Sequence, residues 1–322
     1  MATMKTLNGY GFNATELNGK TSDNYLKKTD TASDSEKLGG KAPKYYLQPR
    51  NLLDNSDFTN PVNQRGKTSY AEVGYTIDRW RNDYADNLSI TSGGIHLTKS
   101  SEISMFIQYL SDEAWNTLKG KAFTIAASTD DGSICVSTGT MPVGTDGVDS
   151  VQTNLGSSGY LFNLYKTDNG RPMARIFSLD QGAEVTLRWV ALYEGTYTRD
   201  TLPPYVPKGY AAELAECQRY YLQFGDDCTS NGYVGSDGKS LWLSIPTPVT
   251  MRALPNLIKS NALEARSLAG RAEIHNYTVI YRNAFANNVL MGISQDEHEF
   301  PASTPISVFF ALGGSPGLDA NF

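Results

Sequence analysis

Short segments in which apolar and polar residues alternate fill most of the chain after residue 50. Examples are residues 74–80 (GYTIDRW), 122–127 (AFTIAA) and 240–245 (SLWLSI). Alternation with a period of two places one face of a strand toward a core. Clusters of Gly, Asp, Asn and Ser separate the segments and mark turns. Many short strands at this spacing, without helix-period segments between them, predict an all-β fold built from sandwiches or barrels.

We expect two regions of such strands. Residues 50–203 predict a β-sandwich of jelly-roll type, whose last strand is the apolar segment 184–193. Residues 226–322 return to alternating segments and predict a second β-sandwich, a C-terminal tip domain of about a hundred residues.

A proline connection and a short amphipathic helix separate these regions at residues 204–225. Three prolines between residues 202 and 207 favour extended backbone. Residues 211–224 then carry apolar side chains at helical spacing, and Gly225 ends the pattern. A helix of this length is marginal alone, so its apolar face must pack on its own domain or on other copies of the chain. The residues of this face are Leu214, Cys217, Tyr221 and Phe224.

The first 49 residues contain one phrase twice. Leu-x-Gly-Lys-x-x-x-x-Tyr-Leu begins at Leu17 and returns at Leu38, an offset of 21 positions. Each copy offers too few apolar side chains to form a core within one chain. We therefore expect residues 1–49 to form a stem between chains. The residues expected at its contacts are Leu17, Tyr25, Leu26, Leu38, Tyr46 and Leu47.

Composition and charge exclude several classes of protein. The chain has 28 Lys and Arg against 34 Asp and Glu, a net charge of −6, and no basic block, so we do not expect a nucleic-acid partner. Charged residues are only 19% and there are 19 Tyr, which is typical of a β-rich protein built for exposure outside a cell. The N-terminus lacks the apolar core of a signal peptide, and no apolar run reaches ~18 residues. We expect synthesis in the cytoplasm without a signal peptide, and no membrane insertion.

The three cysteines and three histidines form no recognisable metal or catalytic pattern. An odd number of cysteines, Cys135, Cys217 and Cys228, argues against a disulfide framework. His298 lies between two glutamates, which a solvated loop explains, and Asp130-Asp131-Gly132-Ser133 could offer oxygens to calcium but is explained by turn chemistry. The common hydrolase and nucleotide-binding motifs are missing. We expect no enzymatic activity, no cofactor and no metal. A glycosidase needs only two carboxylates placed by the fold, so a polysaccharide-degrading protein remains the enzymatic alternative.

Exposed aromatic side chains beside small polar groups are the predicted ligand-binding residues. Sugar rings stack on aromatic faces through their C–H surfaces, while their hydroxyl groups need hydrogen-bond partners. Trp242 has Leu241 and Leu243 as neighbours, and because these face the core, Trp242 points outward. The alternative is that Trp242 packs at an interface between chains or under a loop.

Four further aromatic or imidazole side chains are candidates for the same role. Tyr233, in the segment Asn231-Gly232-Tyr233, is expected in a loop. His275, Tyr277 and Tyr281 share one face of an expected strand at residues 274–281, and which face of that strand is outward stays open.

Several of these segments resemble modules of bacteriophage tail proteins. The repeated Leu-x-Gly-Lys phrase is similar to repeats near the N-termini of tail fibre and receptor-binding proteins. Residues 51–58 (NLLDNSDF), with Asp78-Arg79-Trp80 downstream, resemble sandwich domains of phage and prophage tail proteins. Residues 216–221 (ECQRYY), followed by 245–255 (IPTPVTMRALP), are similar to C-terminal modules of tail fibre and tail tip proteins.

The resemblance implies a homotrimeric adhesion protein of a virion tail or phage-like particle that attaches to a bacterial surface polysaccharide. Its N-terminus would bind a baseplate or adaptor protein, and three identical sites would act together through avidity. The resemblance supplies no defined set of binding residues. Its alternatives are a polysaccharide-degrading tail spike and a purely structural component of the tail or baseplate.

Overall fold

The computed structural model describes residues 49–84, 86–100, 102–141, 151–166, 172–225, 228–312 and 315–321, and the backbone of the two short strands β1 (Glu16–Leu17) and β2 (Lys20–Thr21), which pair antiparallel. The predicted stem contacts lie outside the described residues, apart from the backbone of Leu17. Contacts divide the chain into two units, residues 1–49 with 201–205 and residues 50–200 with 206–322. The second unit holds both β regions, and it is described below.

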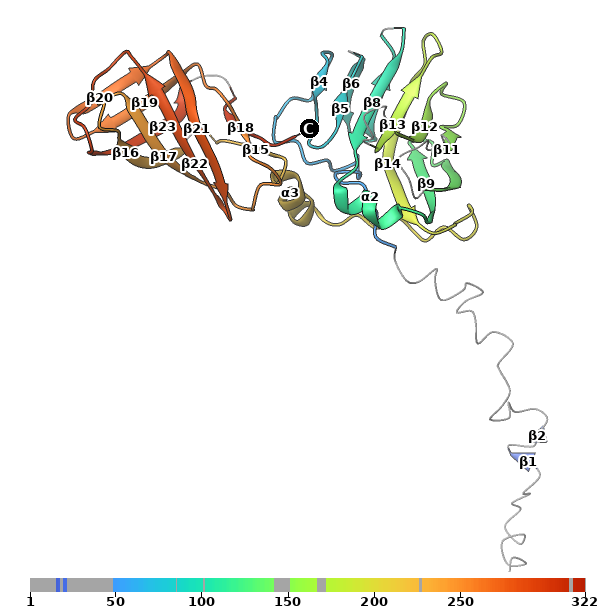
Figure 1. The fold of residues 1–322 in the computed structure, drawn as a ribbon. Helices are drawn as coiled ribbons and strands as arrows, with labels where there is room; N and C mark the ends of the chain where they lie inside the picture. Colours follow the sequence, from blue (N-terminus) through green and yellow to red (C-terminus); the bar gives the residue numbers. More distant parts are fainter. Residues whose placement is uncertain are drawn as a thin grey trace, which may run out of the picture. The chain divides into compact units, whose positions relative to one another are not determined.

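The described residues are almost entirely β-strands, with two short helices, which confirms the all-β prediction (Figure 1). All of the paired strands in the sheets are antiparallel. Neither described helix is long and apolar enough to cross a membrane.

The first β region consists of two six-stranded sheets that share one hydrophobic core, a β-sandwich-like arrangement. The first sheet has the order β10-β9-β14-β7-β6-β3, formed by β3 (Ser69–Tyr70), β6 (Asn87–Thr91), β7 (Gly94–Thr98), β9 (Ala122–Thr129), β10 (Ile134–Thr140) and β14 (Glu184–Glu194). The second has the order β11-β12-β13-β8-β5-β4, formed by β4 (Gly74–Tyr75), β5 (Arg81–Asn82), β8 (Ser104–Tyr109), β11 (Val151–Asn154), β12 (Leu161–Lys166) and β13 (Pro172–Ser178).

The core of this region centres on Trp80. Its indole is fully buried, stacks on Phe106 with ring centroids 4.8 Å apart, and meets Phe58 edge-on at 5.2 Å. The indole N–H donates to the carbonyl of Asn55 at 2.8 Å, so the one polar atom of the ring is satisfied inside the core. Helix α2 (Asp112–Leu118) follows β8, and the Ser111 hydroxyl caps it by accepting the amide N–H of Ala114.

Helix α3 spans Tyr210–Gln218 and is shorter than the predicted helix at 211–224. The residues after it form β15 (Tyr221–Gln223), which pairs with β24 (Gly317–Asp319) in a small sheet that also contains β18 (Asn256–Ile258). Pairing with a strand from the end of the chain satisfies the backbone groups of β15, and this tertiary contact overrides the helical pattern.

The predicted contacts between chains along this helix are therefore corrected. Cys217, Tyr221 and Phe224 are at most 7% exposed and are buried within the chain itself. The ring of Phe224 packs on Phe310, with centroids 5.1 Å apart. Of the four residues only Leu214 is partly exposed, so the other three predicted trimer contacts are unavailable to another copy.

Largely buried ion pairs and one backbone hydrogen bond join α3 to the first β region, and Lys208 Nζ lies 3.7 Å from the Glu213 carboxylate of α3. The Asp54 carboxylate accepts from Arg79 Nε at 3.1 Å and from Lys208 Nζ at 3.1 Å. Glu213 of α3 accepts the backbone N–H of Asn55. The Arg79 guanidinium also lies over the ring of Tyr220, so residues 54, 79 and 220, which are distant along the chain, meet at one place in the fold.

The second β region is built on a seven-stranded sheet with the order β20-β19-β23-β16-β17-β22-β21 (Figure 1). In β17, Leu241, Leu243 and Ile245 are fully buried, which confirms the predicted alternation. The strands are β16 (Thr229–Val234), β17 (Ser240–Pro246), β19 (Ala262–Ser267), β20 (Gly270–Ile274), β21 (Tyr277–Phe285), β22 (Asn288–Gln295) and β23 (Pro305–Leu312).

Candidate functional site

Three aromatic side chains lie in a row across four adjacent strands on the outer face of the seven-stranded sheet. Trp242 of β17 is opposite Tyr233 of β16 on one side and Gly292 of β22 on the other, and Gly292 is opposite Tyr281 of β21. The ring centroids of Tyr233 and Trp242 are 6.4 Å apart, and those of Trp242 and Tyr281 are 5.5 Å apart. Tyr233, Trp242 and Tyr281, with Gly292 between the last two, are called the aromatic row.

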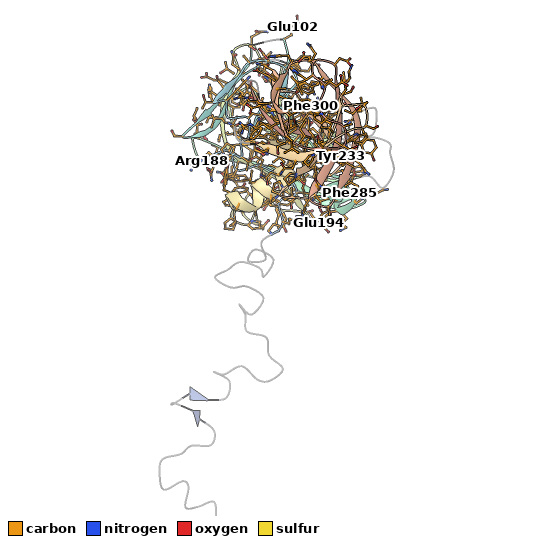
Figure 2. All side chains as sticks on the ribbon, turned by 90° about the vertical axis from the view of Figure 1, so that its left-hand side faces the viewer. Glu102, Arg188, Glu194, Tyr233, Phe285 and Phe300 are labelled. Atoms are coloured by element: carbon orange, nitrogen blue, oxygen red, sulfur yellow. The ribbon has the colours of Figure 1, made fainter. Side chains whose placement is uncertain are left out.

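The aromatic row is accessible to a ligand. The side chains of Tyr233 and Tyr281 are 53% and 41% exposed, and Trp242 is half-buried between them. Figure 2 views the molecule from the side of the seven-stranded sheet and labels Tyr233 and Phe285. Phe285 is a second exposed aromatic residue of β21. Because the rings stand on hydrogen-bonded strands, their spacing is set by the sheet and not by a loop.

Gly292 and a β-bulge bring the Trp242 and Tyr281 rings together. A Cβ atom at Gly292 would lie 3.1 Å from the Tyr281 Cβ and 3.2 Å from Trp242 Cζ3, so only glycine leaves this space open. In β21 the register shifts between Val279 and Tyr281, where Ile280 is the extra residue. The bulge turns Tyr281 to the outer face.

A second row, of polar side chains, runs beside the aromatic row. The Ser307 hydroxyl donates to the Asn231 Oδ1 atom at 2.6 Å, and Asn231 is opposite Ser244 in the sheet. The Ser244 hydroxyl accepts from Asn288 Nδ2 at 2.8 Å. Ser307, Asn231, Ser244 and Asn288 are called the polar row. Hydroxyl and amide groups of this kind are the usual partners of sugar hydroxyl groups.

A cleft of about 540 Å³ opens on the same region, at the ends of β21 and β22. Asn276, Thr278 and Ser294 line it. At its rim the Glu297 carboxylate accepts the backbone N–H groups of His275 at 2.7 Å and of Asn276 at 3.0 Å. The hydrogen bond from His275 is the main cause that holds the pKa of the Glu297 carboxyl below its usual range.

The structure brings together three of the five predicted ligand residues. Trp242, Tyr233 and Tyr281 form the aromatic row, although Tyr233 lies in a strand and not in the expected loop. His275 lies at the rim of the cleft, with its Nε2 atom 3.6 Å from the Glu273 carboxylate.

Tyr277 is corrected from a ligand-binding residue to a core residue. Its side chain is 5% exposed, and its hydroxyl donates to the carbonyl of Ser260 at 3.2 Å. Strict alternation along β21 would put Tyr277 and Tyr281 on one face. The bulge at Ile280 changes the parity, so Tyr277 points inward and Tyr281 outward.

Gly292 and three residues of the polar row (Ser307, Asn231 and Asn288) were not among the residues predicted from the sequence. Cross-strand register brings Ser307, Asn231 and Asn288 together, and none of these is near another along the chain. Gly292 did offer a signal, because an isolated glycine inside a strand pattern often marks close approach of other groups.

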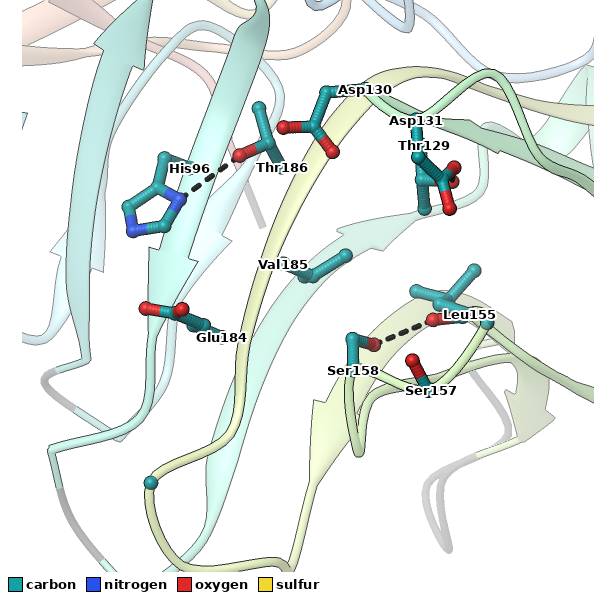
Figure 3. Close-up of a pocket in the computed structure, with 12 residues that line it drawn as sticks. His96, Thr129, Asp130, Asp131, Leu155, Ser157, Ser158, Glu184, Val185 and Thr186 are labelled. Atoms are coloured by element: carbon teal, nitrogen blue, oxygen red, sulfur yellow. Dashed lines mark hydrogen bonds between the residues drawn. The ribbon is translucent and has the colours of Figure 1, made fainter.

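The first β region carries a second, more acidic cleft of about 510 Å³, shown in Figure 3. Asp130, Asp131 and Glu184 line it together with His96, whose Nδ1 atom lies 3.0 Å from the Thr186 hydroxyl. No aromatic residue other than His96 lines this cleft. Within the described ranges, no group of three or more His, Cys, Asp or Glu residues is placed to hold a metal ion.

Asp131 serves the turn that the sequence predicts at residues 130–133. Its carboxylate accepts from the Thr129 hydroxyl at 2.6 Å and from the Ser133 amide at 2.8 Å. These hydrogen bonds, that from Thr129 first, hold the pKa of Asp131 below its usual range. The carboxylate is therefore already occupied with a local structural role.

Comparisons with known proteins add no family assignment. No family model, no curated protein and no solved structure matches the chain.

Proposed function

We propose that the chain is a receptor-binding protein of a phage tail or phage-like particle, and that the aromatic row binds a glycan of the bacterial surface. One observation carries the proposal: three aromatic rings from three strands stand on one accessible sheet face beside a row of hydroxyl and amide groups. Apolar C–H faces of sugars pack on such rings, and sugar hydroxyl groups exchange hydrogen bonds with such polar groups. The motif resemblance to tail proteins supports the setting.

In this proposal the chain acts as a homotrimer in the virion tail. Residues 1–49 form the stem and attach to a baseplate or adaptor protein, and residues 50–203 form a sandwich of jelly-roll type. A single shallow sugar site with a Kd near 1 mM corresponds to about −4 kcal/mol. Three such sites on one particle-bound trimer raise the effective affinity by orders of magnitude without a new contact.

Cell binding by fluorescently labelled full-length protein tests the role of the aromatic row. Trp242→Ala and Tyr281→Ala are expected to weaken binding to host bacteria by about tenfold or more, as loss of a central aromatic contact does. Tyr84→Ala is the matched control, because Tyr84 is also 41% exposed but lies in the first β region. Unchanged binding by Trp242→Ala would overturn the proposal.

The acidic cleft of the first β region favours one second candidate, a polysaccharide-degrading tail spike. Asp130 and Glu184 line that cleft, and a glycosidase needs a pair of carboxyl groups. Incubation of the protein with purified host polysaccharide distinguishes the two functions: new reducing ends, lost in Glu184→Gln, would support hydrolysis. If the protein neither binds host cells nor hydrolyses the polysaccharide, a purely structural tail component would be favoured.

A further inference from the structure

The two rows on the seven-stranded sheet carry no formal charge. The aromatic row contains Tyr, Trp and Gly, and the polar row contains only Ser and Asn. A carboxylate or phosphate group of a ligand placed on them would lose its hydration without meeting a cation. Burial of an unpaired charge costs several kcal/mol, so this surface favours an uncharged ligand.

Two cations beside the polar row, Arg266 and Arg271, are engaged by the Glu264 carboxylate, and Arg282, next to Tyr281, donates to the carbonyl of Pro255. Arg266 is opposite Ser307 and pairs with Glu264, and its guanidinium carbon lies 4.3 Å from the Phe309 ring centroid. Glu264 also pairs with Arg271 at 2.7 Å.

The cleft at the ends of β21 and β22 adds negative charge. Lys239, near this end of the sheet, pairs with Asp296 at 3.2 Å. The cleft itself is lined by Asp296 and Glu297 as well as by Lys259. Lys259 donates to the carbonyl of Tyr277, so its ammonium group is held at the strand edge. An acidic ligand would meet carboxylates here as well.

The geometry of the rows also defines how a ligand would lie. Both rows run across the strands, and β16 and β21 are separated by three strand spacings, about 14 Å at ~4.8 Å each. A linked sugar ring covers about one strand spacing, so the aromatic row accommodates about three rings in line.

Asn231 supplies the hydrogen-bond donors for such a ligand. Its Oδ1 atom accepts from Ser307, which fixes the orientation of the amide. Its Nδ2 atom forms no hydrogen bond with another described residue, and the side chain is exposed. Two N–H donors therefore face solvent beside the rings, with Ser307 as a positioning residue.

From these observations we infer that the ligand of the aromatic row is a neutral oligosaccharide of about three sugar rings, bound across the strands, with Asn231 donating to its hydroxyl groups. This inference rests on the proposed function. It names the class of glycan that the site takes and excludes acidic polysaccharides as its main ligand.

Competition on host cells tests the inference. Surface polysaccharide of the host is separated by anion exchange into neutral and acidic fractions, and each competes with labelled full-length protein. The neutral fraction is expected to displace the protein, with little change between about 50 and 500 mM NaCl, because no ion pair forms. Displacement by the acidic fraction alone, or binding that weakens strongly with salt, would overturn the inference while the proposed function stands.

Variants test the role of Asn231 separately from the proposed function. Asn231→Ala is expected to weaken binding of the neutral fraction about fivefold to tenfold. Ser307→Ala is expected to weaken it less, because in that variant Asn231 keeps its N–H donors and loses only its fixed orientation. Asn154→Ala, an exposed asparagine of the first β region, is the control. Full binding by Asn231→Ala with loss in Trp242→Ala would overturn the role of Asn231. If neither fraction competes and Trp242→Ala binds cells normally, the proposed function itself fails.

Discussion

The guanidinium carbon of Arg79 lies 3.5 Å from the centroid of the Tyr220 ring. Arg79 belongs to the first β region, and Tyr220 follows helix α3. The same guanidinium donates to Asp54 and, through Nη2, to the carbonyl of Tyr109 at 2.9 Å. Its side chain is 1% exposed, and its backbone has a φ of +70°, a conformation rare for a residue with a side chain. This arginine therefore joins the sandwich-like region to the segment that leads into the second sheet.

Arg79→Met is expected to lower the free energy of unfolding by about 3–5 kcal/mol, because it leaves the largely buried Asp54 carboxylate with Lys208 as its one cation. Urea unfolding measures the loss. Arg81→Met is the control, since Arg81 is 35% exposed and its pair with Asp83 is worth about 1 kcal/mol or less. Equal losses in both variants would contradict the special role of Arg79.

Glu213→Gln is expected to change how stability depends on pH. Burial raises the pKa of Glu213 above 4.5, and Lys208 offsets this in part. An acid with a raised pKa in the folded state binds its proton more tightly there, so it contributes stability at low pH that is lost as pH rises through the folded pKa. From about pH 4 to about pH 7, wild type should therefore lose stability relative to Glu213→Gln.

Unfolding at the two pH values measures this difference, and Glu216→Gln on the same helix is the control, because Glu216 is 40% exposed.

The ionisation of Asp54 changes stability with pH in the opposite direction. Burial raises its pKa, but Arg79 and Lys208 outweigh burial and hold the pKa below 3.8, so its stabilisation is lost only as pH falls through the folded pKa. A stability difference between wild type and Glu213→Gln that is constant with pH would refute the prediction.

Gly292→Ala is expected to weaken glycan binding by displacing the Trp242 and Tyr281 rings. The added methyl group would lie 3.1–3.3 Å from three neighbouring side-chain atoms, so the rings must move. Overpacking of this kind costs about 1–3 kcal/mol. Gly225→Ala is the matched control, because its Cβ would meet no atom within 4 Å. Cell-binding assays together with urea unfolding separate a loss of binding from a loss of fold; unchanged binding in Gly292→Ala would argue against a role for the ring spacing.

Cys217 is expected to resist alkylation in the native protein. Its side chain is fully buried, and burial raises the pKa of its thiol well above 9.0. Thiolate is the reactive form, so iodoacetamide should modify Cys217 only after unfolding, whereas the half-buried Cys135 reacts first. Mass spectrometry of native and urea-treated samples measures the order. Rapid native modification of Cys217 would show that the region around α3 opens.

The full-length chain is expected to form a trimer of three 35.2 kDa copies, and deletion of residues 1–49 should release monomers. The doubled phrase at Leu17 and Leu38 offers each chain few apolar side chains for a core of its own, so we expect the proposed stem to form only between chains. Light scattering measures the mass. A monodisperse monomer of the full-length chain would refute the stem, and trimers without residues 1–49 would move the contacts elsewhere.

Local alternation was sufficient to predict the parts of the fold that depend on one strand at a time. The burial of Leu241, Leu243 and Ile245 and the outward position of Trp242 follow from a period of two, and both are present in the structure. The same reasoning failed at Tyr277, because one extra residue at Ile280 reverses the parity of the strand. Helical spacing likewise failed after Gln218, because β15 pairs with β24 where the helix was expected to continue.

The sequence by itself determined that this protein is all-β, that its charge disfavours nucleic acid, and which aromatic side chains were candidates for a ligand. Tertiary structure alone decided which of them lie side by side. The aromatic row depends on register across four strands, on the missing side chain of Gly292 and on the bulge in β21. The pairing of Trp242 with Gly292 joins two segments that are distant along the chain, and the bulge at Ile280 reverses the parity of β21, so alternation within a single strand does not show which side chains meet.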